Sequence, residues 1–446
     1  MDALPSLNTI YSHIPPAHKT LVWISTIIVI YCLTFGPLFI YTRRKQRPTT
    51  FPGVSLLRPL KGVDKDLEKN LVSSFEQAYP NYEILFSVQD PDDSCIPLVE
   101  RLQSVYSHVP SRLIIGGGIG LNPKVANLVP AYDLARHDIL WILDSNIRVD
   151  PSTLASAVAI FANKKVGLVH HIPVGINASS LGGYLDALYL NSVHARMYSA
   201  ANALEIMSMV IGKSNIYRKS VLERAGGLPQ FAKYMAEDNE IGKAIMALGY
   251  AHVIAPELVF QSIGAITVAD FMQRRIRWIR IRKYTVLLPT LYEPFCDAFM
   301  HIGLSGCVVA PALGIPLLTW VAWNLALWFM SDLLTLLAGY SPTHHTIVDV
   351  TIMACLWPLR EAMAFLVWII GMAGSRVLWR GQYYRCNADG TGTALQSQRI
   401  QESKQVDSNS TSNNTSSSTG SSSSVSSSLR KDSKMDASVK IGSSRG

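Results

Sequence analysis

The feature that most constrains this chain is an uncharged, apolar run at residues 21–41, which has no polar face. A helix of about 20 apolar residues is long enough to cross the hydrocarbon core of a bilayer. A basic segment at 43–47 follows it directly. A cleaved signal peptide carries its positive charge before the apolar run, so this order predicts a retained membrane anchor. By the positive-inside rule, the chain after the anchor lies in the cytosol.

Composition supports a membrane protein with a soluble part. The chain has 446 residues, of which 48% are hydrophobic and 16% are charged, against about a quarter charged in a typical soluble protein. Its 40 Lys and Arg exceed its 32 Asp and Glu, but they flank the apolar stretches and do not form one face. That distribution argues against nucleic-acid binding. The six cysteines lie far apart without metal-ligand or disulfide spacing, so free thiols are expected.

Strand-like and helix-like runs alternate between the anchor and residue 143. The strand-like runs are 55–60, 84–88, 113–115 and 139–143, and the helix-like runs between them are 63–78, 96–106 and 123–135. Such alternation is typical of parallel strands joined by right-handed helical crossovers. Further along, 166–170 and 209–214 are strand-like and 183–198 is helix-like. The glycines at 116–120 lack the GxGxxG spacing, which argues against a dinucleotide cofactor.

Charged side chains stand where these strands end and where one helix begins. Asp144 follows the strand 139–143, and Asp90 follows the strand 84–88. Ligands of open α/β sheets bind at the carboxyl ends of strands, and an acid there can hold Mg2+ together with substrate phosphates. The alternative for each acid is an ordinary turn residue. Lys124 begins a helix, where it suits a phosphate group, although a solvated lysine is the alternative.

Two later helices carry further candidates. Asp238, next to Glu237, lies in the first turn of a helix, where acids also occur simply because they favour the helix dipole. After a capping-box-like start at 267–270, Arg274, Arg277 and Trp278 share one helix face. Two guanidinium groups and an indole suit a diphosphate beside a ring. The alternative is an amphipathic helix lying on the membrane with its arginines toward the headgroups.

The ordered set of candidates resembles that of inverting, family-2-like glycosyltransferases with the GT-A fold. The local strings at 57–62, 88–90, 122–124, 166–170 and 236–238 are most similar to the ceramide glucosyltransferase family. The resemblance covers roughly residues 55–385 and is specific as a set. It implies an α/β, GT-A nucleotide-sugar-binding domain with a mixed, mainly parallel sheet, flanked by N-terminal and C-terminal transmembrane helices. One departure is that the usual DxD motif is Asp144-Ser145-Asn146, with a single carboxylate.

The resemblance also implies a reaction and a role for each candidate. Glucose passes from UDP-glucose to the primary hydroxyl of ceramide with inversion, giving β-glucosylceramide and UDP. A divalent cation, Mg2+ or Mn2+, bridges the diphosphate. The implied roles are nucleotide-sugar binding for Asp90, Lys124 and Asp144, metal binding for Asp144, general-base catalysis for Asp238, stabilisation of the departing UDP for Arg274 and Arg277, and an acceptor-side wall for Trp278.

The expected domain organisation follows the hydropathy. We expect an anchor at 1–47, a cytosolic catalytic domain at 48–290 with an interfacial Arg-rich helix at 267–285, a membrane bundle at 291–386 and a disordered Ser-rich tail at 387–446. The bundle contains two candidate spans within 296–339, separated near 314–316, and a third at 348–372. Arg360 and Glu361 interrupt the third span and should pair, lie at an interface or line a cavity. Residues 376–385 are a basic, aromatic stretch expected at the membrane surface.

Two other functions and one point of topology stay open at this stage. A processive polysaccharide synthase shares the Arg-x-x-Arg-Trp signal but needs more spans, and a non-catalytic scaffold would not need the ordered acids. The family resemblance implies a multi-pass protein of the Golgi or ER membrane whose partners are the two substrates and the bilayer. Three downstream spans would place the tail, with its acceptor sequences at 409–416, in the lumen. The basic residues after the last span favour the cytosol instead. The residues do not indicate an oligomeric state.

Overall fold

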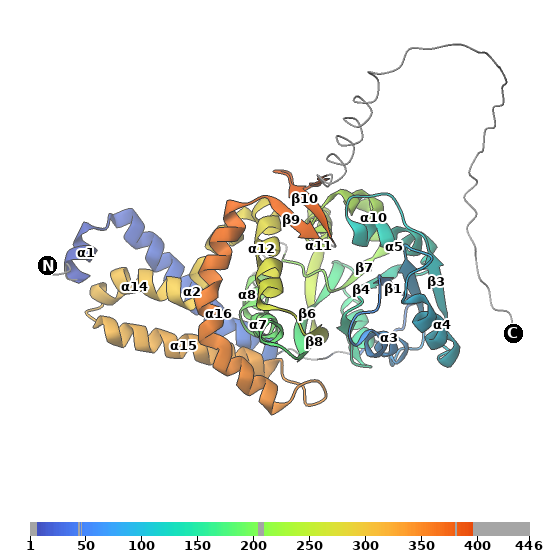
Figure 1. The fold of residues 1–446 in the computed structure, drawn as a ribbon, viewed down its shortest axis with the longest axis horizontal. Coiled ribbons are helices and arrows are strands. Elements are labelled where there is room, and N and C mark those ends of the chain that lie inside the picture. The colour runs from blue at the N-terminus through green and yellow to red at the C-terminus, as the bar shows by residue number, and fades with distance from the viewer. Residues whose placement is uncertain (1–6, 43–44, 46, 204–208, 380, 396–446) are drawn as a thin grey trace, which may run out of the picture.

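The computed structural model describes residues 7–42, 45, 47–203, 209–379 and 381–395. An α/β part lies beside a group of long helices, and α12 (Val268–Thr285) runs along the boundary next to α16 (Ile347–Ala373) (Figure 1). The predicted Ser-rich tail from 396 onward lies outside the described residues. All six cysteines are free thiols, as expected.

The α/β part is built on an eight-stranded sheet of order β3-β2-β1-β4-β7-β6-β8-β5. The first four strands are parallel, β7 runs antiparallel to both of its neighbours, β6 and β8 are parallel, and β5 is antiparallel to β8. The predicted mixed, mainly parallel sheet is therefore confirmed. Its strands are β1 (Val54–Leu60), β2 (Tyr82–Val88), β3 (Ser111–Ile115), β4 (Ile139–Leu143), β5 (Ile147–Arg148), β6 (Val166–Ala178), β7 (Ser214–Arg218) and β8 (Ala251–Gly264).

Helices cover both faces of this sheet, which explains why β4 is a continuous apolar run. Every residue of β1, β2 and β4 is buried. One core lies against α3 (Leu67–Phe75), α4 (Ile96–Val105) and α6 (Thr153–Ile160). The other core lies against α5 (Pro123–Leu134), α9 (Lys219–Arg224), α10 (Gly227–Gln230) and α11 (Glu237–Ala247).

Three predicted element boundaries differ from the structure. The helix expected at 63–78 is the shorter α3, preceded by Asp66 in a left-handed conformation (φ 62°). The strand expected at 209–214 begins only at Ser214, because the amide of Lys213 bonds back to the carbonyl of Ile211 at 2.8 Å and forms a turn. The helix expected at 183–198 is α7 (Leu181–Tyr189) and α8 (Ala195–Ala203), joined by a π-helical turn, Leu190–His194.

Among the described residues, three helices are long and apolar enough to cross a membrane: Pro16–Ile40 within α2 (Pro16–Thr42), α15 (Leu317–Ala338) and α16. The anchor and the last expected span are confirmed as helices of this kind. The region 296–339 breaks near Gly314 as predicted, but α14 (Ala298–Ala312) has only 15 residues. Together with Leu287–Cys296 it forms a pair bent by 78°, which makes a fourth span at most.

The stretch expected at the membrane surface is instead part of a small antiparallel sheet. Its strands are β9 (Arg376–Trp379), β10 (Gln382–Cys386) and β11 (Gly392–Ala394). Val377 and Tyr384 pack on Met235 of the α/β part, and Thr391 bridges to Tyr234. Residues 376–394 therefore lie on the same side of any bilayer as the α/β part. After α2, the described residues contain two helices that could span a membrane, or three if the bent pair forms one span. The packing of β9–β11 on the α/β part favours two, and the expected count of three, with its luminal tail, stays a prediction.

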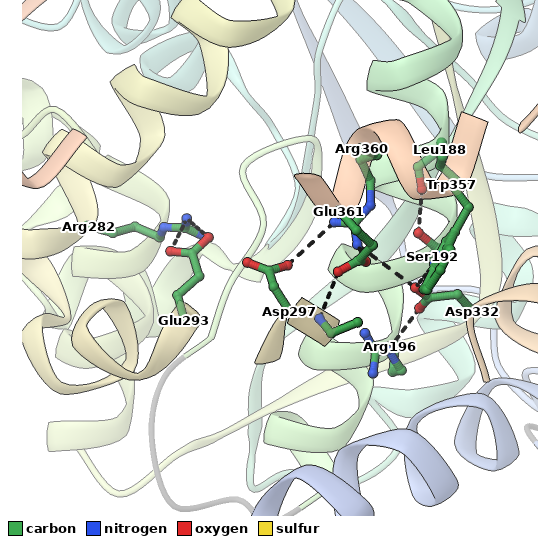
Figure 2. A network of polar contacts seen from close by, with 11 residues as sticks. Leu188, Ser192, Arg196, Arg282, Glu293, Asp297, Asp332, Trp357, Arg360 and Glu361 are labelled. Carbon is green, nitrogen blue, oxygen red and sulfur yellow. Dashed lines mark hydrogen bonds and ion pairs between the residues drawn. The ribbon is translucent and has the colours of Figure 1, made fainter. Parts of the chain in front are cut away.

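Buried charges hold the membrane helices to each other. Arg360 pairs with its neighbour Glu361, as expected for charges at this depth, and lies 3.6 Å from the Asp297 carboxylate and 4.0 Å from that of Asp332 (Figure 2). Arg196 of α8 pairs with Asp332 at 3.1 Å. A second Asp332 oxygen accepts from the indole of Trp357 at 2.8 Å. This charge network therefore joins α8, α15, α16 and the start of α14.

Removing Asp332 should leave the buried Arg196 guanidinium without its acidic partner, and breaking a buried ion pair in this way typically costs about 3–5 kcal/mol. We expect Asp332→Ala to lower the thermal unfolding temperature of the detergent-solubilised protein strongly. Asp133→Ala, at an exposed position, should leave it nearly unchanged. Equal unfolding temperatures for the two variants, measured by tryptophan fluorescence, would show that the charge network does not stabilise the bundle.

Candidate active site

An open cleft with about 1490 Å³ of empty volume lies at the carboxyl end of β4. It is bounded by the segment after β4, the beginnings of α5 and α11, the turn before β7, and α12. Five of the seven predicted site residues line it together: Lys124, Asp144, Asp238, Arg277 and Trp278. The sheet topology brings these residues to one place, since β4 lies next to both β1 and β7.

Asp144 lies between two lysines. Its Oδ1 is 2.9 Å from Lys124 Nζ, and its Oδ2 is 3.0 Å from Lys213 Nζ. Burial acts to raise the pKa of Asp144, but the two ammonium groups outweigh it and hold that pKa at about 2. The carboxylate is therefore fully ionised at neutral pH.

Lys124 is the most connected residue of the cleft. Its Nζ also lies 3.2 Å from Glu237 Oε1 and donates to the carbonyl of Gly212 at 2.7 Å. Asn122 caps α5 and donates to the other Glu237 oxygen at 2.7 Å. Burial disfavours the charged amine, yet the pKa of Lys124 is raised because the nearby carboxylates outweigh burial. One ammonium group thus joins the strand-end acid to the first turn of α11.

Asp238 has a different environment from Asp144. It lines the cleft in the first turn of α11, and its carboxylate lies against Gly212. Burial and the neighbouring Glu237 carboxylate raise its pKa to about 7, although Lys124 acts to lower it. The site therefore holds one carboxylate that is always ionised and a second that gains and loses a proton near neutral pH, which is the property of a general base.

The arginines of α12 do not all face the cleft. Arg274 turns away to Asp186 of α7, with Nη1 2.5 Å from Oδ2. Arg277 lines the cleft and donates to the carbonyl of Leu378 in β9 at 3.4 Å. Trp278 lies beside it, with the buried Arg275 guanidinium 3.9 Å from its ring centroid. Arg277 thus lines the cleft and Arg274 does not, and the role of the two arginines on one ligand stays a prediction.

The other basic residues of α12 bind protein groups, which argues against a helix whose arginines face lipid headgroups. Lys283 donates to the carbonyls of Met372 and Gly374 at 2.9 and 2.7 Å, and Arg280 donates to that of Arg376 at 2.5 Å. The carbonyls of Met372 and Gly374 lie at the end of α16, where cations favour the helix dipole, and that of Arg376 lies at the start of β9. The basic face of α12 therefore attaches the α/β part to a membrane helix.

Asp90 lies at the carboxyl end of β2, as predicted, but it is exposed and does not line the cleft. Its Oδ1 accepts the amide of Asp92 at 3.0 Å, which is the arrangement of a turn residue. Asp90 could therefore contact a bound nucleotide only if part of that nucleotide extended beyond the cleft. The structure thus leaves the proposed role of Asp90 as a prediction.

Three residues that line the cleft were not predicted from the sequence as site residues: Lys213, Trp379 and His194. Lys213 precedes β7, and only the antiparallel pairing of β7 with β4 brings it to Asp144. Trp379 reaches the cleft from β9, beyond the last membrane helix. His194 is 2% exposed, and neither of its ring nitrogens has a hydrogen-bond partner among the described residues. Burial, with Arg275 and Arg282 nearby, lowers the pKa of His194 well below its ordinary value. A mid-helix histidine gave no signal of this in the sequence.

Protein side chains at this site could supply only some of the ligands that a divalent cation needs. Within the described ranges, no three His, Cys, Asp or Glu side chains come together as a metal site. Asp144 supplies one ionised carboxylate at the cleft, beside Ser145 and Asn146. Mg2+ commonly binds one or two carboxylates and completes its shell with water and substrate phosphates. Both oxygens of Asp144 contact lysine ammonium groups, so a cation here would need most of its ligands from a diphosphate and water.

Comparison with known proteins places the chain in a family. Residues 19–392 match the family model "Glycosyl transferase family 21". The chain is 29% identical over 460 residues to a ceramide glucosyltransferase of Komagataella phaffii, covering 83% of this chain and 90% of that protein. It is 27% identical over 384 residues to ceramide glucosyltransferase 3 of Caenorhabditis elegans, covering 82% and 81%.

Among solved structures, the chain is similar to a mannosyltransferase from Pyrobaculum calidifontis in complex with GDP-Man and Mn2+. The TM-score is 0.48 and the identity 16%, over 80% of this chain and 97% of that one. The family model alone spans most of this chain, from the anchor through the small C-terminal sheet. The chain therefore belongs to glycosyl transferase family 21.

Proposed function

We propose that this protein transfers glucose from UDP-glucose to the primary hydroxyl of ceramide, with inversion at the anomeric carbon. The observation that carries the proposal is the pairing, in one cleft, of the lysine-flanked Asp144 with Asp238, whose pKa is about 7. The activity named for the family's curated relatives supports the choice of lipid and sugar. A polysaccharide synthase is less well supported, because three or at most four candidate spans lie in the described residues.

Glycosyl transfer requires a base that takes the proton of the acceptor hydroxyl, and positive groups that stabilise the negative charge on the departing UDP. The acceptor oxygen attacks the anomeric carbon, the bond to the UDP oxygen breaks, and Asp238 takes the hydroxyl proton. Lys124, Lys213 and Arg277 supply positive charge at the cleft, where UDP leaves with its electron pair. Trp278 and Trp379 provide flat apolar surfaces for the sugar and the acceptor. A bound Mg2+ or Mn2+, held by Asp144, would neutralise the diphosphate.

We further propose that the protein resides in the Golgi or ER membrane with its catalytic part in the cytosol. The basic segment after the first span supports this orientation. Residues 48–290 form the catalytic unit in this proposal, and residues 376–394 complete it, since β9 contributes Trp379 to the cleft. Membranes incubated with radiolabelled UDP-glucose and ceramide should yield a single-sugar lipid. A labelled polymer, or no product, would refute the proposal.

Replacing the base should abolish transfer but keep the donor bound. Asp238→Asn preserves the shape of the side chain and removes proton acceptance, so kcat should fall by at least about a hundredfold while UDP binding stays close to that of the wild type. The wild-type kcat/KM should rise about tenfold per pH unit below pH 7 and level off above it, since the ionised base is the active form. Turnover within a few-fold of the wild type in Asp238→Asn would exclude Asp238 as the base.

The substitution Gly212→Ala tests the position of Asp238 independently. A Cβ at this glycine would lie 2.7 Å from Asp238 Oδ2, so the carboxylate must move. Displacing a catalytic group by about 1 Å can cost a hundredfold in rate, and we expect such a loss in kcat for Gly212→Ala with little change in thermal stability. Gly303→Ala is the control, because a Cβ there meets nothing within 4 Å. Equal rates for both variants would contradict the assigned position.

Asp144→Ala should abolish both activity and the binding of Mn2+ in the presence of UDP, measured by electron paramagnetic resonance. The reason is that Asp144 is the single carboxylate at the expected DxD position and is ionised. Asn146→Asp adds a second carboxylate and should alter metal preference only modestly. An Asp144→Ala enzyme that remained active and sensitive to EDTA would place the cation elsewhere.

A further inference from the structure

A second cavity, with an empty volume of about 870 Å³, adjoins the catalytic cleft on its membrane side. It lies between the π-helical turn with α8, α12, α13 (Leu287–Tyr292) and α16. Most of its lining is apolar and includes Val193, Met197, Ile279, Met363, Val367 and Trp368.

The cavity and the cleft are adjacent. Six residues line both, which are His194, Tyr198, Met209, Trp278, Arg282 and Val286. A mostly apolar space therefore lies directly beside the cleft that holds the candidate base. The wall opposite the catalytic part is α16, a candidate membrane span, so apolar molecules are available on that side.

An ion pair between Arg282 and Glu293 lies at the junction, which is the place where the cleft and the cavity meet. Both oxygens of Glu293 accept from Arg282 Nη2, at 2.6 and 2.7 Å, and Arg282 lines both the cleft and the cavity (Figure 2). The side chains are 19% and 16% exposed, so the pair is largely shielded from water. A carboxylate can accept from an amide N–H or a hydroxyl, and a guanidinium can donate to a carbonyl. The pair thus matches both groups of a secondary amide.

We propose that this cavity is the acceptor site and binds the hydrocarbon part of an amide-linked lipid, while Arg282 and Glu293 bind its amide. The inference rests on the proposed function and deepens it. The lipid's primary hydroxyl then lies toward Asp238 in the cleft, because the junction separates the two spaces. Arg282 and Glu293 are positioning residues, since the reacting oxygen and carbon lie beyond them.

The charge network makes one wall of this site rigid. Asp297 and Arg360 line the cavity and also belong to the network that joins α8, α15 and α16 (Figure 2). Their charges are compensated by each other and by Glu361. The network therefore fixes α16, which forms one wall of the cavity, relative to α8 and α15.

Two alanines on α16 give a matched test of the cavity. Ala364 lines it, whereas Ala362 is exposed two residues earlier on the same helix. In Ala364→Phe the added ring should raise the KM for a C16 ceramide about tenfold or more and leave the KM for UDP-glucose within about twofold. In Ala362→Phe both constants should match the wild type. An unchanged ceramide KM in Ala364→Phe, or equal effects in both variants, would overturn the assignment of the cavity.

Glu293→Gln tests recognition of the amide, and it still does so if Ala364→Phe fails to fold. A site built to bind a polar group rejects an analogue that lacks it. The wild type should strongly prefer ceramide to 1,2-diacylglycerol, which has a primary hydroxyl but no amide N–H. Glu293→Gln should reduce this preference about tenfold without changing UDP-glucose KM, and an unchanged preference would overturn the role of the pair. A wild type that glucosylates neither lipid would refute the proposed function itself, a result distinct from failure of these variants.

Discussion

The active cleft depends on one ammonium group. Lys124 at the start of α5 contacts Asp144 after β4, Glu237 in α11 and the carbonyl of Gly212 before β7. Without a cation there, three carboxylates would repel one another in a partly buried space. With it, Asp144 is kept ionised while Asp238, farther from the cation, has a pKa near 7. Lys124 thus helps to give Asp144 and Asp238 different pKa values. It also connects α5 to α11 and to the segments after β4 and before β7.

The helix α12 connects this electrostatic centre to the membrane part. Its basic residues serve different ends of the structure: Arg274 and Arg275 bind Asp186 on α7, Arg280 and Lys283 bind the carbonyls at the end of α16, and Arg282 binds Glu293. Arg277 and Trp278 are left for the cleft. Close packing reinforces the connection, because a Cβ at Gly371 of α16 would lie 2.6 Å from Ile279. The same helix, α12, therefore lines the cleft and packs against the candidate membrane span α16.

The small C-terminal sheet shows why the catalytic unit is not a single segment of sequence. The chain leaves the α/β part, forms the membrane helices, and returns to place Trp379 in the cleft and Val377 on Met235. The contacts of β9 and β10 with Met235 place the small sheet beside the α/β part, which requires an even number of crossings between the two. A family-wide match that continues to residue 392 is consistent with a sheet that belongs to the functional unit.

The sequence alone determined the features that depend on local pattern. The uncharged run predicted the anchor, the alternation of strand-like and helix-like runs predicted the sheet, and the position of Asp144 after a buried strand placed it at the cleft. These predictions hold because burial and backbone hydrogen bonding repeat with the period of the element. The resemblance of the ordered motifs to a known family supplied the reaction.

Only the tertiary structure decided which polar residues meet. Helical spacing gave Arg274 and Arg277 the same face, but the buried Asp186 carboxylate on a neighbouring helix draws Arg274 away from the cleft. Lys213 became a partner of Asp144 only through an antiparallel strand pairing that no local pattern encodes. Trp379 and His194 likewise acquire their places in the cleft from packing against elements distant in the chain. Long-range electrostatics and packing fix such contacts, and a one-dimensional pattern carries no record of either.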